Sequence, residues 1–347
     1  MLADELDFVL GVDTHRDEHA LAVVARPSGA VVAELCVRAD RDGYAAALAF
    51  ARERARGVRV WAIEGTGSYG KGLLRSLLAA GERVVEVERP RRHGRQAGQK
   101  TDALDARRAA RSLLAEDKPA LPRAAGAREA LRVSSSVRAG AVMARTSALN
   151  QLRALLVTCP EPLRAELRGL TRARLLTRCQ TLDREPGDDL ELAATKRALQ
   201  LLATRIEALA REQRELEQTL RTLSAELAPR LQAEQGVGPI GAAQALISWS
   251  HPGRVRSEAA FARLAGTAPI PASSGKTIRH RLDRGGDRKL NTALHQIVVT
   301  RRKHDPRTIA YVERRRSQGK TDREINRCLK RYLARHLYRL LEASTAT

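Results

Sequence analysis

The chain has 347 residues, and its 62 Lys and Arg outnumber its 40 Asp and Glu to give a formal net charge of +22. This excess predicts a polyanionic partner such as a nucleic acid, or an acidic surface. Aromatic residues are only 3% of the chain, which excludes base stacking as the main binding mode and favours contacts between Arg and phosphate.

The cysteines and the hydropathy pattern set further bounds. Four cysteines, Cys36, Cys159, Cys179 and Cys328, are scattered without Cys-x-x-Cys spacing, which argues against structural zinc and a disulfide framework. No apolar run reaches membrane-spanning length, and the acidic N-terminus lacks a signal-peptide pattern. We therefore expect a soluble protein of a reducing, cytoplasmic compartment, with no membrane partner.

The first third of the chain alternates between strand and helix patterns. In chain order, we expect strands at 8–12, 20–25 and 31–37, a helix at 44–56, a strand at 58–63, a helix at 73–80, a strand at 83–87 and a helix at 103–114. The first three strands read as an antiparallel meander. This order is that of the α/β ribonuclease H-like (RuvC-like) fold.

Four carboxylates occupy the places where that fold carries its acids. Asp13 ends the first strand, Glu64 ends the fourth, and Asp102 and Asp105 share one face at the start of the last helix. Hard oxygen ligands without His or Cys suit Mg²⁺ or Mn²⁺, and a two-metal arrangement fits phosphodiester chemistry. The alternative is four unrelated surface acids. His15 is read here as a turn residue rather than a ligand.

The middle of the chain is predicted to be helical and to contain a coiled coil. Apolar residues recur at alternating spacings of three and four, at Leu199, Leu202, Ile206, Leu209, Leu216, Leu220, Leu223 and Leu227. The seam is interrupted at Gln213, where a polar side chain can fix the register. Two alternatives stay open: self-association of two copies, or an intramolecular helical hairpin with residues 126–157.

The C-terminal part combines a glycine turn with a basic, hydroxyl-containing loop. Gly236 and Gly238, followed by Pro, resemble a helix-hairpin-helix turn whose amides meet a phosphate, or form an ordinary turn between two helices. Further on, Ser273 and Ser274 lie in a loop followed by many cations. A serine there is either a phosphodiester nucleophile or a phosphate contact. We expect helices at 258–266, 289–302 and 322–343.

Three groups of residues are predicted to contact nucleic acid. They are Arg91, Arg92, Arg95 and Lys100 before the last N-terminal helix, the glycines Gly236 and Gly238, and Lys276, Arg279, Arg281, Arg284 and Arg288 after the serine loop.

With these residues assembled, the chain resembles the bridge-RNA-guided DEDD transposases of the insertion sequence one-hundred-ten family. The resemblance covers nearly the whole length and rests on six motifs in order: Gly11-Val-Asp13-Thr, Ile63-Glu64-Gly-Thr-Gly-Ser-Tyr69, Lys100-Thr-Asp102-Ala-Leu-Asp105-Ala, Gly236-Val-Gly-Pro, Leu264-Ala-Gly-Thr-Ala-Pro269 and Ser274-Gly275. The chain departs from the family after Gly275, where Asn291 stands at a position at which Arg is common.

The resemblance implies three domains: a RuvC-like domain at 1–118 with a DEDD metal site, a helical linker and coiled coil at 119–235, and a mostly α-helical transposase domain at 236–347. It implies Ser274, with Ser273 as the adjacent alternative, as the catalytic serine. It also implies donor and target DNA, a non-coding bridge RNA, dimers that synapse as tetramers, and a bacterial location at the nucleoid.

Two other readings remain. One is a metal-dependent RuvC-like junction nuclease in which the serines only bind phosphate. The other is an inactive nucleic-acid-binding relative, against which the intact set of four acids argues.

Overall fold

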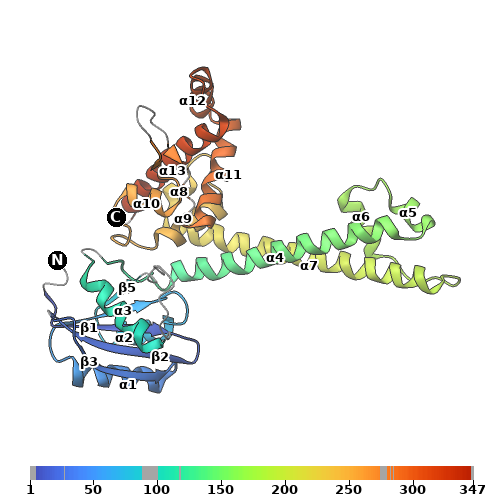
Figure 1. Ribbon diagram of the computed structural model, residues 1–347. Helices are drawn as coiled ribbons and strands as arrows, with labels where there is room; N and C mark the ends of the chain where they lie inside the picture. Colours follow the sequence, from blue (N-terminus) through green and yellow to red (C-terminus); the bar gives the residue numbers. More distant parts are fainter. Residues whose placement is uncertain are drawn as a thin grey trace. The chain divides into compact units, whose positions relative to one another are not determined.

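The computed structural model describes residues 5–26, 28–87, 101–116, 119–273, 280–281, 283 and 285–344. The chain forms two compact units, residues 1–124 with 253–256 and residues 125–252 with 257–347, which are coloured along the chain in Figure 1. In the described part of the chain, no helix is long and apolar enough to cross a membrane.

The first unit is a five-stranded mixed sheet with helices packed on it. Its elements are β1 Phe8–Thr14, β2 Glu18–Ala25, β3 Val31–Arg38, α1 Arg41–Arg54, β4 Arg59–Glu64, α2 Lys71–Ala79, β5 Val84–Val87 and α3 Asp102–Leu114. The strand order is β3-β2-β1-β4-β5. β1 pairs antiparallel with β2, and β2 with β3, whereas β1 pairs parallel with β4, and β4 with β5. The predicted α/β unit and its element order are confirmed.

Both faces of the central strands are buried, which explains why β1 and β4 read as continuous apolar runs. Leu10 and Trp61 pack in a core with residues of α1 and α2. Val9 and Val60 point the other way, into a core shared with α3. Because successive strand residues alternate between faces, one sheet supports two helical layers.

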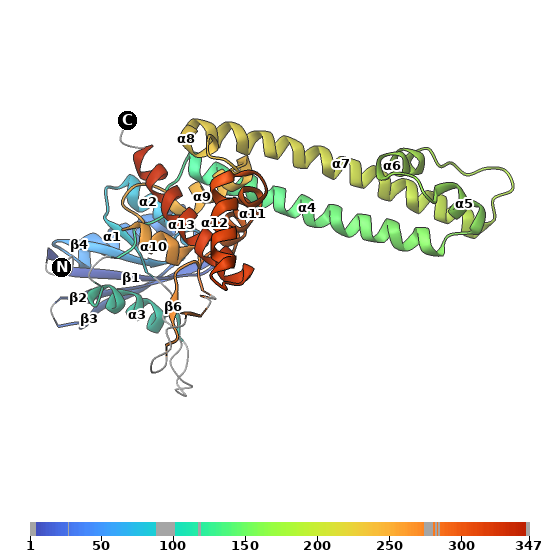
Figure 2. The ribbon, with the colours of Figure 1, turned by 90° about the horizontal axis from the view of Figure 1, so that it is seen from above.

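The second unit begins with a long helical hairpin. α4 Ala127–Thr158 and α7 Leu190–Leu227 lie side by side and run in opposite directions in both views (Figures 1 and 2). They are connected through the short helices α5 Glu161–Leu167 and α6 Arg172–Gln180. α7 starts at the cap Asp189, whose side chain accepts a hydrogen bond from the Leu192 amide at 2.7 Å, and it ends before Pro229 rather than near Gln235.

The predicted heptad seam packs inside this hairpin. Leu199, Leu202 and Ile206 are buried in one core with Leu152 of α4. The polar seam residue Gln213 accepts a hydrogen bond from Arg145 of α4 at 3.4 Å. The structure thus realises the intramolecular alternative, in which α4 supplies the surface that the leucines bury.

Further helices and a two-stranded ribbon complete the second unit. They are α8 Pro229–Gln232, α9 Pro239–Trp249, α10 Glu258–Leu264, α11 Arg288–His304, α12 Pro306–Ser317 and α13 Asp322–Ala343, with a two-stranded ribbon of β6 Ile270–Pro271 and β7 His280–Arg281. The sequence analysis missed α12 and the ribbon. The signal for α12 was present: Asp305 accepts from the Thr308 amide at 3.2 Å, and Pro306 stands at the first helical position.

Candidate metal centre

Two of the predicted acids lie at the ends of neighbouring parallel strands. Val12 of β1 pairs with Ile63 of β4, and Asp13 and Glu64 are the next residue on each strand. The Thr14 hydroxyl donates to the Glu64 carbonyl oxygen at 2.9 Å and ties the two strand ends together. Carboxyl ends of parallel strands share one sheet edge, so the register found here brings Asp13 and Glu64 to the same edge.

Helix α3 brings the other two acids to the sheet. Thr101 caps it, and its hydroxyl accepts from the Leu104 amide at 3.3 Å, so Asp102 and Asp105 fall in the first turn. The helix lies directly on β1 at Gly11, where an added Cβ would be only 2.0 Å from the Ala106 carbonyl oxygen. The absence of a side chain at this one strand position therefore sets how closely the acids of α3 approach Asp13.

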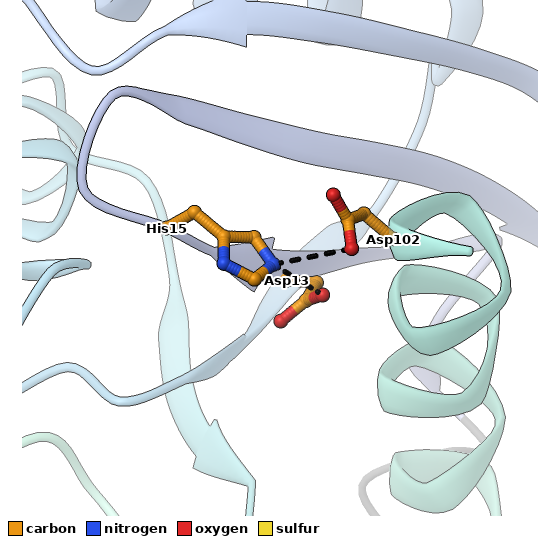
Figure 3. A group of neighbouring side chains, drawn as sticks. All are labelled: Asp13, His15 and Asp102. Atoms are coloured by element: carbon orange, nitrogen blue, oxygen red, sulfur yellow. Dashed lines mark hydrogen bonds and ion pairs between the residues drawn. The ribbon is translucent and has the colours of Figure 1, made fainter. Parts of the chain in front are cut away.

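His15 joins two of these acids (Figure 3). Its Nε2 atom lies 3.1 Å from Asp13 Oδ2 and 3.3 Å from Asp102 Oδ1. One ligand atom from each of the three residues lies within 4.8 Å of the others. The sequence analysis read His15 as a turn residue, and it does lie directly after β1. Its position two residues beyond Asp13 was the available signal.

The four predicted carboxylates are not equivalent. The side chain of Asp13 is 5% exposed, whereas that of Asp102 is 58% exposed. Asp105 pairs with Arg108 at 2.9 Å, one helical turn along α3. Among the described residues, the group that can hold a metal is therefore Asp13, His15 and Asp102, with Glu64 at the adjacent strand end and Asp105 one turn further along.

This group fits a divalent cation. Two neighbouring carboxylates, one of them buried, repel each other unless a cation lies between them, and in the structure the Nε2 atom of His15 contacts both. Carboxylate oxygens are the ligands of Mg²⁺ and Mn²⁺, and an imidazole nitrogen also binds divalent first-row metals. The open side formed by Asp102 leaves the group accessible to a substrate.

The neighbouring His19 has a different character. It is fully buried on β2, where its Nδ1 lies 3.0 Å from the Glu18 carbonyl oxygen and its ring stacks on Tyr44. Burial lowers the pKa of His19, which keeps the ring uncharged at neutral pH. His19 therefore supports the sheet edge without adding charge to the metal group.

The predicted glycine turn is a close-packed helix start. Gly236 has a positive φ of 81° and packs against the Ile297 carbonyl oxygen of α11, 3.2 Å from where its Cβ would be. Gly238 precedes α9, whose first residue is Pro239. Packing against α11 accounts for Gly236, whereas nothing lies within 4 Å of a Cβ added to Gly238. The contact of both glycines with phosphate stays a prediction.

The segment that leads to the serine loop is held by a second glycine contact. A Cβ added to Gly266 would lie 2.8 Å from the Gly285 carbonyl oxygen, and a Cβ added to Gly286 would lie 2.4 Å from the Leu264 carbonyl oxygen. Asn291 donates to the Ala265 carbonyl oxygen at 2.6 Å. Asn291, the residue that departs from the family pattern, thus holds the turn before this segment.

The remaining predicted contacts divide into two sets. Arg281 on β7 and Arg288 at the start of α11 are exposed. Eight predicted residues lie outside the described part of the chain: Arg91, Arg92, Arg95, Lys100, Ser274, Lys276, Arg279 and Arg284.

Two family models match the chain. Residues 10–160 match a model for DEDD transposases of IS110 elements, described as Transposase. Residues 228–313 match a model described as Transposase IS116/IS110/IS902 family. The first contains the metal group and the second contains the glycine turn, the serine loop and Asn291. No curated protein matches the chain.

Proposed function

Because the chain belongs to the IS110 family of transposases, we propose that it cuts and rejoins DNA with Ser274 as nucleophile and a divalent-metal centre at Asp13, Glu64, Asp102 and Asp105. Breaking and rejoining DNA strands is the activity of this family. The proposal adds the residues, the metal and the covalent step.

The observation that carries the proposal is the group of Asp13, His15 and Asp102 at the edge of the β3-β2-β1-β4-β5 sheet. Acids on the first strand, the fourth strand and a following helix support the ribonuclease H-like assignment and Mg²⁺ or Mn²⁺ as cofactor. A divalent cation bound there acts as a Lewis acid on phosphate oxygens. His15 helps to hold Asp13 and Asp102 at a fixed separation.

The serine step conserves the energy of the broken bond. The Ser274 oxygen forms a bond to phosphorus, and the deoxyribose oxygen leaves with the proton that the serine gives up. A hydroxyl of the second DNA strand then attacks the phosphoserine, returns its own proton to the serine, and restores a phosphodiester. In this proposal the exposed Arg281 contacts the non-bridging oxygens of the phosphate.

The family resemblance extends the proposal to partners and organisation. These are a non-coding bridge RNA that pairs with donor and target DNA, dimers that form tetramers on synapsis, and a cytoplasmic location at the nucleoid. The three-part division at 1–118, 119–235 and 236–347 belongs to the same proposal. The serine loop and the carboxylates then act on one phosphodiester, within one copy of the chain or between two.

The test compares Ser274→Ala with its neighbour Ser273→Ala on suicide DNA substrates. Wild type and Ser273→Ala should give a protein–DNA adduct on a denaturing gel, whereas Ser274→Ala should bind metal and DNA but form neither adduct nor recombinant. Free 5′-phosphate ends without an adduct would favour the junction nuclease. Full activity in chelator would remove the metal, and sequencing of co-purified RNA tests the guide.

A further inference from the structure

A cavity of about 780 Å³ lies in the second unit between α13, the turn after α10 and strand β7. Seven Lys or Arg residues line it against two carboxylates, those of Asp283 and Glu324. Its volume falls within the range of small-molecule pockets, about 300–1,000 Å³, and is far larger than one phosphate needs.

One wall of this α13 cavity is a row of arginines. Arg327, Arg331 and Arg335 are four residues apart, so they lie on one face of α13. Arg335 is held by Glu258, to which its Nε donates at 2.8 Å. Arg331 makes no side-chain hydrogen bond or ion pair with another described residue. Its charge contributes, after those of Arg335 and Arg339, to the lowered pKa of Glu258, and its guanidinium donors stay available to a ligand.

The rest of the lining adds cations and few compensating charges. Arg281 of β7 and Lys320 before α13 line the cavity. Both acids of the lining already accept backbone hydrogen bonds: Asp283 from Gly285 at 2.8 Å and Glu324 from Thr321 at 2.9 Å. The cavity therefore carries an uncompensated positive charge that an anionic ligand neutralises.

Lys330 lies half-buried in the wall of the cavity. Its ammonium donates to Asn291 Oδ1 at 3.0 Å. Burial, and then the charge of Arg327, lowers the pKa of Lys330. Through Asn291 the lysine is linked to the Ala265 carbonyl oxygen, so the cavity wall and the turn before the serine loop are held by one network.

An aromatic ring completes the lining. Tyr332 is 56% exposed in a chain with few aromatic residues. Its ring packs edge-on against Tyr311, with centroids 6.1 Å apart and planes at 90°. Tyr311 thus supports the ring from one side, and the exposed surface of Tyr332 offers a base a stacking partner beside the arginines.

We propose that the α13 cavity binds one strand of a nucleic acid, with Arg331 and Arg281 on its phosphates and one base stacked on Tyr332. The proposal rests on the proposed function only in taking the substrate or guide strand as ligand. A single strand is favoured over a duplex because a duplex keeps its bases stacked on one another and offers the cavity only its backbone. DNA and RNA share this chemistry, and the test separates them.

The experiment measures binding of fluorescent single-stranded DNA, single-stranded RNA and duplex DNA by anisotropy over a salt series, with the full-length protein. Arg331→Ala should lower the slope of log affinity against log salt by about 0.7, the value for one phosphate contact on a single strand. The control, Arg174→Ala, removes an exposed charge on α6, outside the lining of the cavity, and should keep the slope. The single strand that shows the loss identifies the ligand.

A second set of variants tests the stacking of a base on Tyr332. Tyr332→Leu should weaken single-strand binding by about five- to a hundredfold, the effect of one stacked base, whereas Tyr332→Phe should bind like wild type and the duplex should respond to neither. Unchanged slopes in Arg331→Ala on both single strands would overturn the proposal, as would absent single-strand binding by the wild type. If the variants changed single-strand binding as expected but the wild-type protein exchanged no strands, the proposed function would be wrong and the binding site would stand.

Discussion

Gly11→Ala should separate α3 from the sheet and disrupt the metal group. The new Cβ would lie 2.0 Å from the Ala106 carbonyl oxygen and 2.5 Å from the Ala110 amide nitrogen. Both are backbone atoms, so no side-chain rotation relieves the contact, and α3 must retreat by about 1 Å or more. Overpacking costs about 1–3 kcal/mol, and we expect the upper end of that range in the free energy of unfolding.

The matched control is Gly140→Ala in the interior of α4. Nothing lies within 4 Å of a Cβ added to Gly140, and alanine is better than glycine in a helix by about 1 kcal/mol. A change from glycine to alanine should therefore stabilise the second unit at Gly140 and destabilise the first unit at Gly11.

Urea unfolding can follow each unit through its own tryptophan. Trp61 is buried in the first unit and Trp249 in the second, so each substitution is measured with the other tryptophan replaced by phenylalanine. Calorimetry with Mn²⁺ should show weakened binding in Gly11→Ala, because retreat of α3 carries Asp102 away from Asp13. A Gly11→Ala protein with wild-type stability and Mn²⁺ affinity would refute the close approach of α3 to β1.

Three further outcomes are expected. Asp13→Asn should lose the calorimetric signal of Mn²⁺ binding while it unfolds no earlier than wild type, since it removes repulsion with Asp102; undiminished Mn²⁺ binding would exclude Asp13 as a ligand. Ile206→Ala should cost about 2–4 kcal/mol in the hairpin core, whereas Leu201→Ala, 49% exposed, should cost far less; equal losses would contradict the packing of α7 on α4. Arg59, and then Trp61, lowers the pKa of Glu82, so this carboxylate stabilises the fold above its unfolded pKa of about 4.3, and that contribution is lost as pH falls through the lower folded pKa. Glu82→Gln should therefore flatten the acid side of the unfolding profile, and an unchanged profile would assign the acid sensitivity to other groups.

The strands and helices of the first unit and the positions of the acids could be predicted from the sequence, because both depend on local patterns. Apolar runs bounded by turn residues predicted β1 to β5. The carboxylates were found because Asp13 and Glu64 stand where strands end. The spacing of three residues between Asp102 and Asp105 placed both on one face at the start of the predicted helix.

The tertiary structure decided which of these residues meet. His15 became part of the metal group only because Gly11 lets α3 lie on β1, a contact between residues about a hundred positions apart in the chain. The seam of α7 has the same apolar pattern whether α4 or a second copy covers it, so periodicity alone left the partner open. Likewise, Arg331 and Arg281 belong to separate local patterns, and a cavity joins them because folding fixes the distances between segments that the sequence leaves independent.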